Sequence, residues 1–253
     1  IGASMNNKNL ILEKLTLVMP TYQRQKYALR NMRYWSDTNV TLMVLDGSED
    51  PINSKILNSF GANIVYINDP SSIEQRLNKA HFKINTEYVA LIGDDEFYVV
   101  SAVKSCIQEL EKDDSLIACC GSCLGFYFNK KSSDIYGWRP YGDGFIDYTS
   151  TMHDSSVERL ESHMNNYLPT LIYGITRSSP WKLAMKTATE RKFNFFASSE
   201  LQFEMLVSFF GKGKVIKELM WLRSAGENEP VRDVYKGIEP KIRIDDWWVS
   251  NKK

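Results

Sequence analysis

The sequence has no excess of charge of either sign, and it has no long hydrophobic run. Its 253 residues include 31 Lys+Arg and 31 Asp+Glu, so the formal net charge is +0 and the isoelectric point is about 7.0. Proteins that bind nucleic acid through bulk electrostatics carry a basic excess, so the composition argues against that class. No apolar run approaches the roughly 18–20 residues that span a bilayer, and we expect no signal peptide.

Cysteine and histidine are scarce, with four cysteines and three histidines in the chain. Cys119, Cys120 and Cys123 lie in one apolar segment that predicts a buried strand. A structural zinc site needs two spaced cysteine pairs, or cysteine and histidine at ligand spacing, whereas Cys120-x-x-Cys123 is a single pair. We interpret the cysteines as small core residues of a protein in a reducing cytoplasm. Any bound metal would therefore use carboxylates.

No glycine-rich phosphate-binding motif follows the first expected strand. The loop at this point is Pro20-Thr-Tyr-Gln-Arg24, which contains neither Gly-x-Gly-x-x-Gly nor the P-loop Gly-x-x-x-x-Gly-Lys. This excludes the Rossmann dehydrogenases and the P-loop NTPases. It also disfavours a sugar nucleotidyltransferase, which would need a glycine-rich basic loop here to bind a triphosphate.

What the chain does contain is a regular alternation of apolar runs and amphipathic segments. In the first half we expect strands at 15–19, 40–45, 62–67 and 87–92, and helices at 25–35, 52–60, 73–84 and 99–110. Such alternation predicts an α/β fold, with right-handed βαβ units and a mostly parallel central sheet flanked by helices. In the second half we expect strands at 116–124 and 214–222 and helices at 155–165, 180–191 and 198–210.

Polar side chains follow three of the four strands of the first half. They are Thr21, Tyr22 and Arg24 after the first strand, Asp46 after the second, and Asp94, Asp95 and Glu96 after the fourth. Ligands of open α/β sheets bind outside the carboxyl ends of the strands. We therefore expect these side chains to share one edge of one sheet.

The three consecutive acids repel one another, so a partner should compensate their charge. Mg²⁺ or Mn²⁺ would do so, because these cations take one or two carboxylates and complete their coordination with water and substrate phosphates. Such a cation would neutralise a diphosphate leaving group. The alternative is an acidic turn that is stabilised by the N-terminus of the next helix.

Three short segments occur in a characteristic order: Val18-Met-Pro-Thr-Tyr-Gln-Arg24, Val44-Leu-Asp-Gly-Ser48 and Tyr88-Val-Ala-Leu-Ile-Gly-Asp-Asp-Glu-Phe97. Together they resemble the nucleotide-sugar half of a GT-A-fold glycosyltransferase, of the bacterial inverting, family-2-like kind. The resemblance implies a single GT-A-like domain at 5–253. Its parts would be a nucleotide-sugar-binding half at 15–115, an acceptor-binding and catalytic half at 116–230 and a tail at 231–253. Residues 1–4 are expected to be a cloning remnant.

The resemblance also implies roles for residues at the shared edge. The nucleotide would be held by Pro20, Thr21, Tyr22, Arg24, Asp46 and Asp94. Arg76 would meet the diphosphate, although a solvent-exposed helix arginine explains it equally well. Asp94-Asp95-Glu96 stands where the family has its D-x-D metal motif, so we expect Asp95 to bind the metal with either Asp94 or Glu96.

Inverting transfer also needs a carboxylate base that takes the proton of the acceptor hydroxyl. In the family this base opens a helix downstream of the metal motif. Glu200, within Ser198-Ser199-Glu200-Leu201, stands at the matching position and is the candidate. The alternative is a first-turn glutamate that only stabilises its helix. Asp154 is the second candidate for the base.

These expectations describe a metal-dependent glycosyltransferase that moves a sugar from a nucleoside diphosphate, with UDP favoured, to a glycan or lipid-linked acceptor in bacterial surface polysaccharide synthesis. The alternatives are a non-catalytic module that binds nucleotide sugars or glycans, and a sugar nucleotidyltransferase. Trp247-Trp248 beside Lys252-Lys253 has three explanations: contact with the inner face of the plasma membrane, packing on a further domain of a parent protein, or a truncated end.

Overall fold

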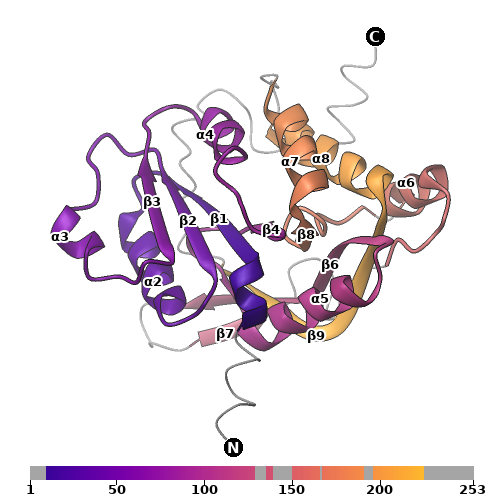
Figure 1. Cartoon of the computed structure of the whole chain (residues 1–253), viewed down its shortest axis with the longest axis horizontal. Coiled ribbons are helices and arrows are strands. Elements are labelled where there is room, and N and C mark those ends of the chain that lie inside the picture. Colours follow the sequence, from indigo (N-terminus) through magenta and orange to yellow (C-terminus); the bar gives the residue numbers. More distant parts are fainter. Residues whose placement is uncertain (1–9, 129–134, 139–149, 166, 191–195, 225–253) are drawn as a thin grey trace, which may run out of the picture.

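The computed structural model describes residues 10–128, 135–138, 150–165, 167–190 and 196–224, which form one sheet with helices on both faces (Figure 1). The strands are β1 (Leu15–Thr21), β2 (Thr41–Asp46), β3 (Ile64–Asn68), β4 (Tyr88–Leu91), β5 (Phe97–Tyr98), β6 (Leu116–Phe128), β7 (Ile135–Trp138), β8 (Ile175–Arg177) and β9 (Lys212–Ser224). The helices are α2 (Gln25–Ser36), α3 (Ser54–Leu57), α4 (Ile73–Ala80), α5 (Val100–Lys112), α6 (Ser156–Asn165), α7 (Ser178–Thr189) and α8 (Phe196–Phe210), after a 3₁₀ turn, η1 (Ile11–Lys14). The expected remnant at 1–4, the tail at 231–253 and Trp247-Trp248 lie outside the described residues.

The first half of the sheet is parallel, as predicted. Strand β1 pairs in parallel with β2 and β4, and β2 pairs in parallel with β3, which gives the strand order β3-β2-β1-β4. Helices α2, α3 and α4 lie in the three crossovers. Helix α4 starts with a capping box in which Ser72 and Gln75 each accept a hydrogen bond from the other's backbone N–H.

The second half makes the sheet mixed rather than mostly parallel. Strand β8 pairs antiparallel with both β4 and β6, β5 pairs antiparallel with β9, and only β6 and β9 are parallel to each other. The full order is β3-β2-β1-β4-β8-β6-β9-β5, with β7 on β6. The reason is strand β8, which is only three residues long, lies between β4 and β6 and is antiparallel to both. Strands β4 and β6 therefore point in the same direction.

The two faces of the sheet have separate apolar cores. Along β1, Leu15, Leu17 and Met19 belong to the core beneath α2 and α5, whereas Val18 belongs to the core beneath α4, α7 and α8. This alternation follows from the two-residue period of a strand. The sheet is therefore covered on both sides, as its apolar strands predict.

The structure confirms that the cysteines are core residues. Cys106, Cys119, Cys120 and Cys123 are all buried and form no disulfide. Among the described ranges, no helix combines the length and the apolar character needed to cross a bilayer.

Candidate functional site

The carboxyl ends of β1, β2 and β4 bring the three predicted polar clusters to one edge of the sheet, which we call the carboxyl edge. Thr21 at the end of β1 is in register with Asp46 at the end of β2. The backbone N–H of Gly47 donates to the carbonyl of Thr21 at 2.9 Å, so the pairing of β1 and β2 continues to the last residues. The shared edge expected from strand polarity is thus present.

The acidic turn after β4 is tied to the loop after β1. The Thr21 hydroxyl donates to Asp94 Oδ2 at 2.7 Å. Arg24 Nη2 lies 3.3 Å from Asp94 Oδ1 and 2.8 Å from Asp95 Oδ2, and both aspartates are buried. The carboxylates of Asp94 and Asp95 are therefore both directed toward the same nitrogen of the Arg24 guanidinium.

Helix α2 fixes the backbone of the acidic turn. The fully buried Asn31 donates from Nδ2 to the carbonyl of Asp94 at 2.7 Å, and Arg30 Nη2 donates to the carbonyl of Asp95 at 3.1 Å. Strand β5 separates the acids from α5, whose N-cap is Val99. The acids therefore do not cap the next helix, and that alternative is wrong.

Glu96 points away from the two aspartates, toward β9. Its Oε2 accepts a hydrogen bond from Trp221 Nε1 at 2.9 Å, and Arg223 Nε lies 3.8 Å from Oε1. Burial, followed by the charge of Asp95, raises the pKa of Glu96 to about 7 despite Arg223 and Trp221. Burial also raises the pKa of Asp94 to about 6, although Arg24 and Thr21 act against it. The carboxylates that converge are those of Asp94 and Asp95.

Asp46 is fully buried at the end of β2 and accepts four hydrogen bonds. Ser48 donates from its backbone N–H and its hydroxyl at 2.9 and 2.6 Å, Tyr66 from its hydroxyl at 2.6 Å and Gln25 from Nε2 at 3.0 Å. Burial by itself would raise the pKa of Asp46, but these bonds outweigh it and the pKa is lowered. Ser48 and Gln25 also line a polar pocket of about 270 Å³ with Gln23, Glu49 and Asp50.

Arg76 is buried, so it is not the solvent-exposed helix arginine of the alternative interpretation. Its Nη1 donates to the carbonyls of Thr21 and Leu45 at 2.7 and 2.5 Å, which joins α4 to the ends of β1 and β2. A Cβ atom on Gly47 would lie 2.5 Å from Arg76 Cζ, so the glycine makes room for the guanidinium. Whether Arg76 also contacts a diphosphate stays a prediction.

The remaining predicted nucleotide residues, Pro20 and Tyr22, lie at the same edge. Pro20 is in β1 opposite Leu45, and the half-buried Tyr22 accepts a hydrogen bond from Gln23 Nε2 at 3.2 Å. Gln23 has a positive φ of 53°, and its backbone N–H donates to the Ser48 hydroxyl at 2.9 Å. The loop after β1 is thus anchored on the loop after β2.

Glu200 lies in the second turn of α8, because the helix starts at Phe196; it is not the first-turn glutamate of the alternative. Strand β9 begins at the edge of the sheet that lies opposite the carboxyl edge, and helix α8 ends two residues before β9. The first half of α8 therefore lies toward the carboxyl edge. Glu200 Oε1 accepts a hydrogen bond from the Tyr167 hydroxyl at 3.0 Å.

Tyr173 packs against Trp221, the residue that donates to Glu96. Its ring stacks on Trp221 with a centroid separation of 4.3 Å, and its carbonyl accepts from the Tyr98 hydroxyl at 2.8 Å. Burial raises the pKa of Tyr173 most, and the negative charges of Glu96 and Glu200 raise it further.

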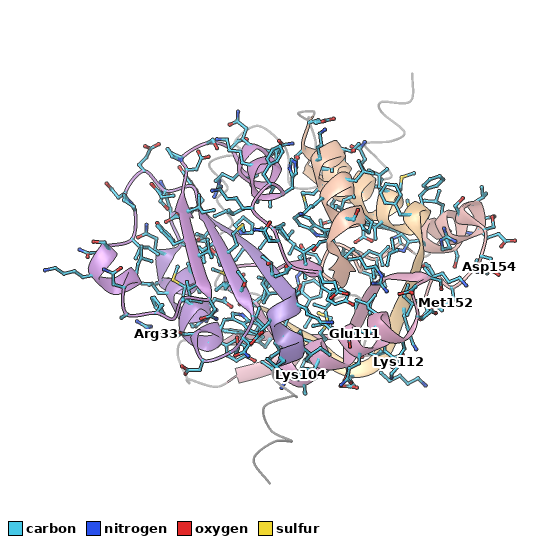
Figure 2. All side chains as sticks on the ribbon, in the orientation of Figure 1. Arg33, Lys104, Glu111, Lys112, Met152 and Asp154 are labelled. Atoms are coloured by element: carbon cyan, nitrogen blue, oxygen red, sulfur yellow. The ribbon has the colours of Figure 1, made fainter. Side chains whose placement is uncertain are left out.

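Asp154 is not brought to the carboxyl edge. Strands β4, β6 and β9 run in the same direction, so Lys212, the first residue of β9, lies at the opposite edge of the sheet. Lys212 Nζ contacts Asp154 Oδ1 at 2.6 Å, and the Asp154 side chain is 95% exposed. Figure 2 shows Asp154 at the periphery of the molecule. The structure therefore corrects its assignment as the second candidate base.

Sequence reasoning missed Glu204, which is fully buried one turn after Glu200. It accepts hydrogen bonds from the backbone N–H groups of Leu171 and Ile172 at 3.0 and 2.8 Å and lies 2.9 Å from His163 Nε2. The sequence does contain a signal for it, because Glu204 lies within the apolar run of α8. An ionisable residue in such a run predicts a buried carboxylate, and a buried carboxylate needs hydrogen-bond partners.

The donor set of the acidic turn fits a hard divalent cation. No group of three His, Cys, Asp or Glu side chains within the described ranges is arranged to hold a metal. Two carboxylates suffice, however, for a cation that takes its other ligands from phosphates and water. Asp95 Oδ2 is buried, and its contact in the described part of the chain is the cationic nitrogen of Arg24 rather than a neutral donor.

No protein-family model and no curated protein sequence matches the chain. Solved structures with the same fold do exist. A crystal structure of S. aureus TarS 1-349 in complex with UDP-GlcNAc has a TM-score of 0.60 and 16% identity over 85% of this chain and 59% of that one. The complex of TarS 1-349 with UDP has a TM-score of 0.55 and 15% identity over 88% of this chain and 62% of that one.

A further crystal structure of S. aureus TarS has a TM-score of 0.55 and 16% identity over 88% of this chain. The chain spans only 38% of the length of that structure. At these identities the likeness concerns the fold. The GT-A-like α/β fold predicted from the sequence is confirmed.

Proposed function

We propose that this chain is a glycosyltransferase that transfers a sugar from a UDP-linked donor, with inversion and with Mg²⁺ or Mn²⁺. One observation carries the proposal. Polar groups suited to a nucleoside and two converging carboxylates meet at the carboxyl edge of a fold shared with a protein that was crystallised with UDP-GlcNAc and with UDP. Open α/β sheets bind their ligands at this edge.

In this proposal, residues on one side of β1 bind the nucleoside of the donor, and residues on the other side bind the cation that contacts its diphosphate. The pocket beside Asp46 offers amide, hydroxyl and carboxylate groups, which suit the hydrogen-bonding edge of a base and the hydroxyls of a ribose. Asp95 with Asp94 would hold the divalent cation, which supplies positive charge to a departing diphosphate when bound. Glu96 is the weaker candidate ligand because Trp221 and Gly93 already donate to its Oε2.

Glu200 would act as the base. As the acceptor oxygen attacks the anomeric carbon, its proton would pass to the Glu200 carboxylate while the bond to the diphosphate breaks and the electron pair leaves with the phosphate oxygen. Burial raises the pKa of Glu200, and the nearby charge of Glu204 raises it further, against the hydrogen bond from Tyr167. A raised pKa makes the carboxylate a better proton acceptor.

The acceptor in this proposal is a glycan or a lipid-linked saccharide, and the pathway is bacterial surface polysaccharide synthesis at the inner face of the plasma membrane. Both are supported by the family resemblance of the motifs in 15–110. The main rival is a module that binds nucleotide sugars without turning them over.

A thermal-shift screen of nucleotides and nucleotide sugars, with and without Mn²⁺, tests the proposal. We expect UDP and at least one UDP-sugar to raise the melting temperature only when Mn²⁺ is present, because the cation joins the diphosphate to the aspartates. Asp95→Asn should melt near the wild type without ligand and lose this shift, whereas the exposed Asp37→Asn should keep it. Slow release of UDP from the bound UDP-sugar would support a transferase, and binding without any release would support the rival.

A further inference from the structure

Arg24 occupies the point on which the two aspartates converge. One nitrogen, Nη2, is within 3.3 Å of a carboxylate oxygen of Asp94 and 2.8 Å of one of Asp95. The aspartate side chains are 6% and 9% exposed, whereas that of Arg24 is 22% exposed. The charge of the acidic turn is therefore compensated within the chain itself, by a side chain that reaches solvent.

The backbone that carries Arg24 is held separately from its guanidinium. Arg24 is the N-cap residue of α2, and the preceding Gln23 is fixed by its hydrogen bond to Ser48. The guanidinium also lies 4.6 Å from the centre of the Tyr27 ring. Because an arginine side chain has several rotatable bonds, the guanidinium can leave the aspartates while its backbone stays in place.

A guanidinium and a divalent cation cannot share this point. Two positive charges about 3 Å apart repel strongly in a partly buried site, so a metal ion bound by Asp94 and Asp95 would have to displace Arg24. Guanidinium groups bind phosphates through paired hydrogen bonds. A diphosphate held by the same metal would offer the displaced guanidinium a new partner.

We propose that Arg24 is an internal counter-ion that competes with the divalent cation for Asp94 and Asp95 and moves to the diphosphate when cation and donor bind together. This inference rests on the proposed function for the identity of the diphosphate. It makes the binding of metal and donor mutually dependent: the cation alone has to displace Arg24 without offering it a new partner. The site would then be loaded with metal chiefly when a donor is present.

Arg30 is a separate case. It donates to a backbone carbonyl of the acidic turn, and its guanidinium lies 4.8 Å from the ring centre of Phe97 and 5.2 Å from that of Tyr27. These contacts make it a support of the turn. Arg33, on the same helix, is exposed and is labelled at the surface in Figure 2, so it provides a matched arginine control.

The experiment is a titration of Mn²⁺ into the wild type, Arg24→Gln, Arg24→Lys and Arg33→Gln, followed by electron paramagnetic resonance of free Mn²⁺, with and without UDP. For the wild type we expect UDP to tighten Mn²⁺ binding about tenfold or more. Arg24→Gln should bind Mn²⁺ alone about tenfold more tightly than the wild type. UDP should then tighten its Mn²⁺ binding by a smaller factor than in the wild type, because only the direct contact of cation and diphosphate remains to couple the two. Arg24→Lys should lie between them, and Arg33→Gln should match the wild type.

Unchanged or weaker binding of Mn²⁺ alone by a folded Arg24→Gln variant would overturn the inference. So would a wild type in which UDP leaves Mn²⁺ affinity unchanged although UDP binds. Failure of the wild type to bind UDP under any condition would instead refute the proposed function and the coupling. The arm with Mn²⁺ alone would still decide whether Arg24 competes for the aspartates. If Arg24→Gln fails to fold by circular dichroism, binding of Mn²⁺ alone by Arg24→Lys decides the outcome: tighter binding than the wild type supports the inference, and wild-type affinity overturns it.

Discussion

Glu200 offers the sharpest test of chemistry at the level of single residues. Glu200→Gln keeps an oxygen that accepts the Tyr167 hydrogen bond but cannot take up a proton. We expect UDP binding to be unchanged and transfer to fall by about 10²–10⁴-fold. Calorimetry with UDP and a donor-turnover assay measure the two quantities.

Glu190→Gln is the matched control, because Glu190 is an exposed acid at the end of α7. It should change neither UDP binding nor turnover. Near-normal turnover by Glu200→Gln would remove Glu200 from the role of base and leave it as a structural partner of Tyr167.

Glu96 should make the stability of the metal-free protein depend on pH. Its pKa is raised from 4.5 to about 7, so between these values the folded protein holds a proton that the unfolded chain has released. The folded state is therefore favoured by this group at low pH, and that contribution is lost as the pH rises toward and past 7. Asp94, with a pKa raised to about 6, acts in the same direction over a lower range.

Glu96→Gln removes this dependence, because the amide imitates the protonated acid and can still accept from Trp221. In chelator at pH 8 we expect the variant to be more stable than the wild type by about 3 kcal/mol, since the pKa of Glu96 is raised from 4.5 to about 7 and one pKa unit corresponds to about 1.4 kcal/mol. The difference should shrink at pH 5. Urea unfolding at both pH values measures it, and a wild type that gains stability relative to the variant on going to pH 8 would contradict the assignment.

The residues of the carboxyl edge could be predicted because strand polarity alone decides which loops meet there. Asp46, Asp94 and Asp95 were found in this way. Arg24 was expected at the same edge, but its ion pairs with Asp94, 70 residues later, and with Asp95 could not be predicted. Asn31 looks like an ordinary polar residue of α2, so its hydrogen bond to Asp94 could not be predicted either. Sequence spacing carries no information about such pairs, which depend on how α2 packs on the sheet.

Among the helices and strands, length decided what could be predicted. The strand expected at 15–19 is β1, Leu15–Thr21, and the helix expected at 155–165 is α6, Ser156–Asn165. Strands β5 and β8 were missed because two and three residues show no periodicity. These two short strands make three of the antiparallel pairs of the sheet, beside the pair of β6 with β7, so the mixed topology of the second half could not be predicted either.

The packing of α8 against the 167–173 loop depends on Glu204. Its carboxylate accepts two backbone N–H groups of that loop, and a carboxylate is the side chain that can accept at both oxygens. Glu204→Gln would turn an amide N–H toward one of these donors. We expect a loss of about 1–3 kcal/mol in the free energy of unfolding, measured in urea, because a buried donor is left without an acceptor.

Glu161→Gln on the exposed side of α6 is the control and should unfold with the wild type. Because the loop carries Tyr167 and Tyr173, Glu204→Gln should also reduce donor turnover more than it reduces UDP binding. A variant as stable as the wild type would show that Glu204 does not hold the loop.

At the scale of the whole molecule, the expected nucleotide-sugar-binding half at 15–115 is not separable from the rest. Strand β4 lies between β1 and β8, and β5 pairs with β9. The turn that carries the two aspartates is therefore covered by residues more than 100 positions later, such as Trp221. The single domain at 5–253 stays a prediction, and this interleaving, which a pattern confined to the first half does not reveal, is the observation that favours it.

We accordingly expect the chain to unfold in urea as one cooperative unit. Removal of the second half would expose β4 and the apolar faces of β1 and β2, so a fragment of residues 10–115 should lack a cooperative transition. In the full chain, circular dichroism and tryptophan fluorescence should give the same midpoint. The slowest amide protons of β2 and β6, from the two halves, should exchange with the same free energy, because both require global opening. Two separate transitions, or a fragment that unfolds cooperatively by itself, would show instead that the nucleotide-binding half is an independent domain.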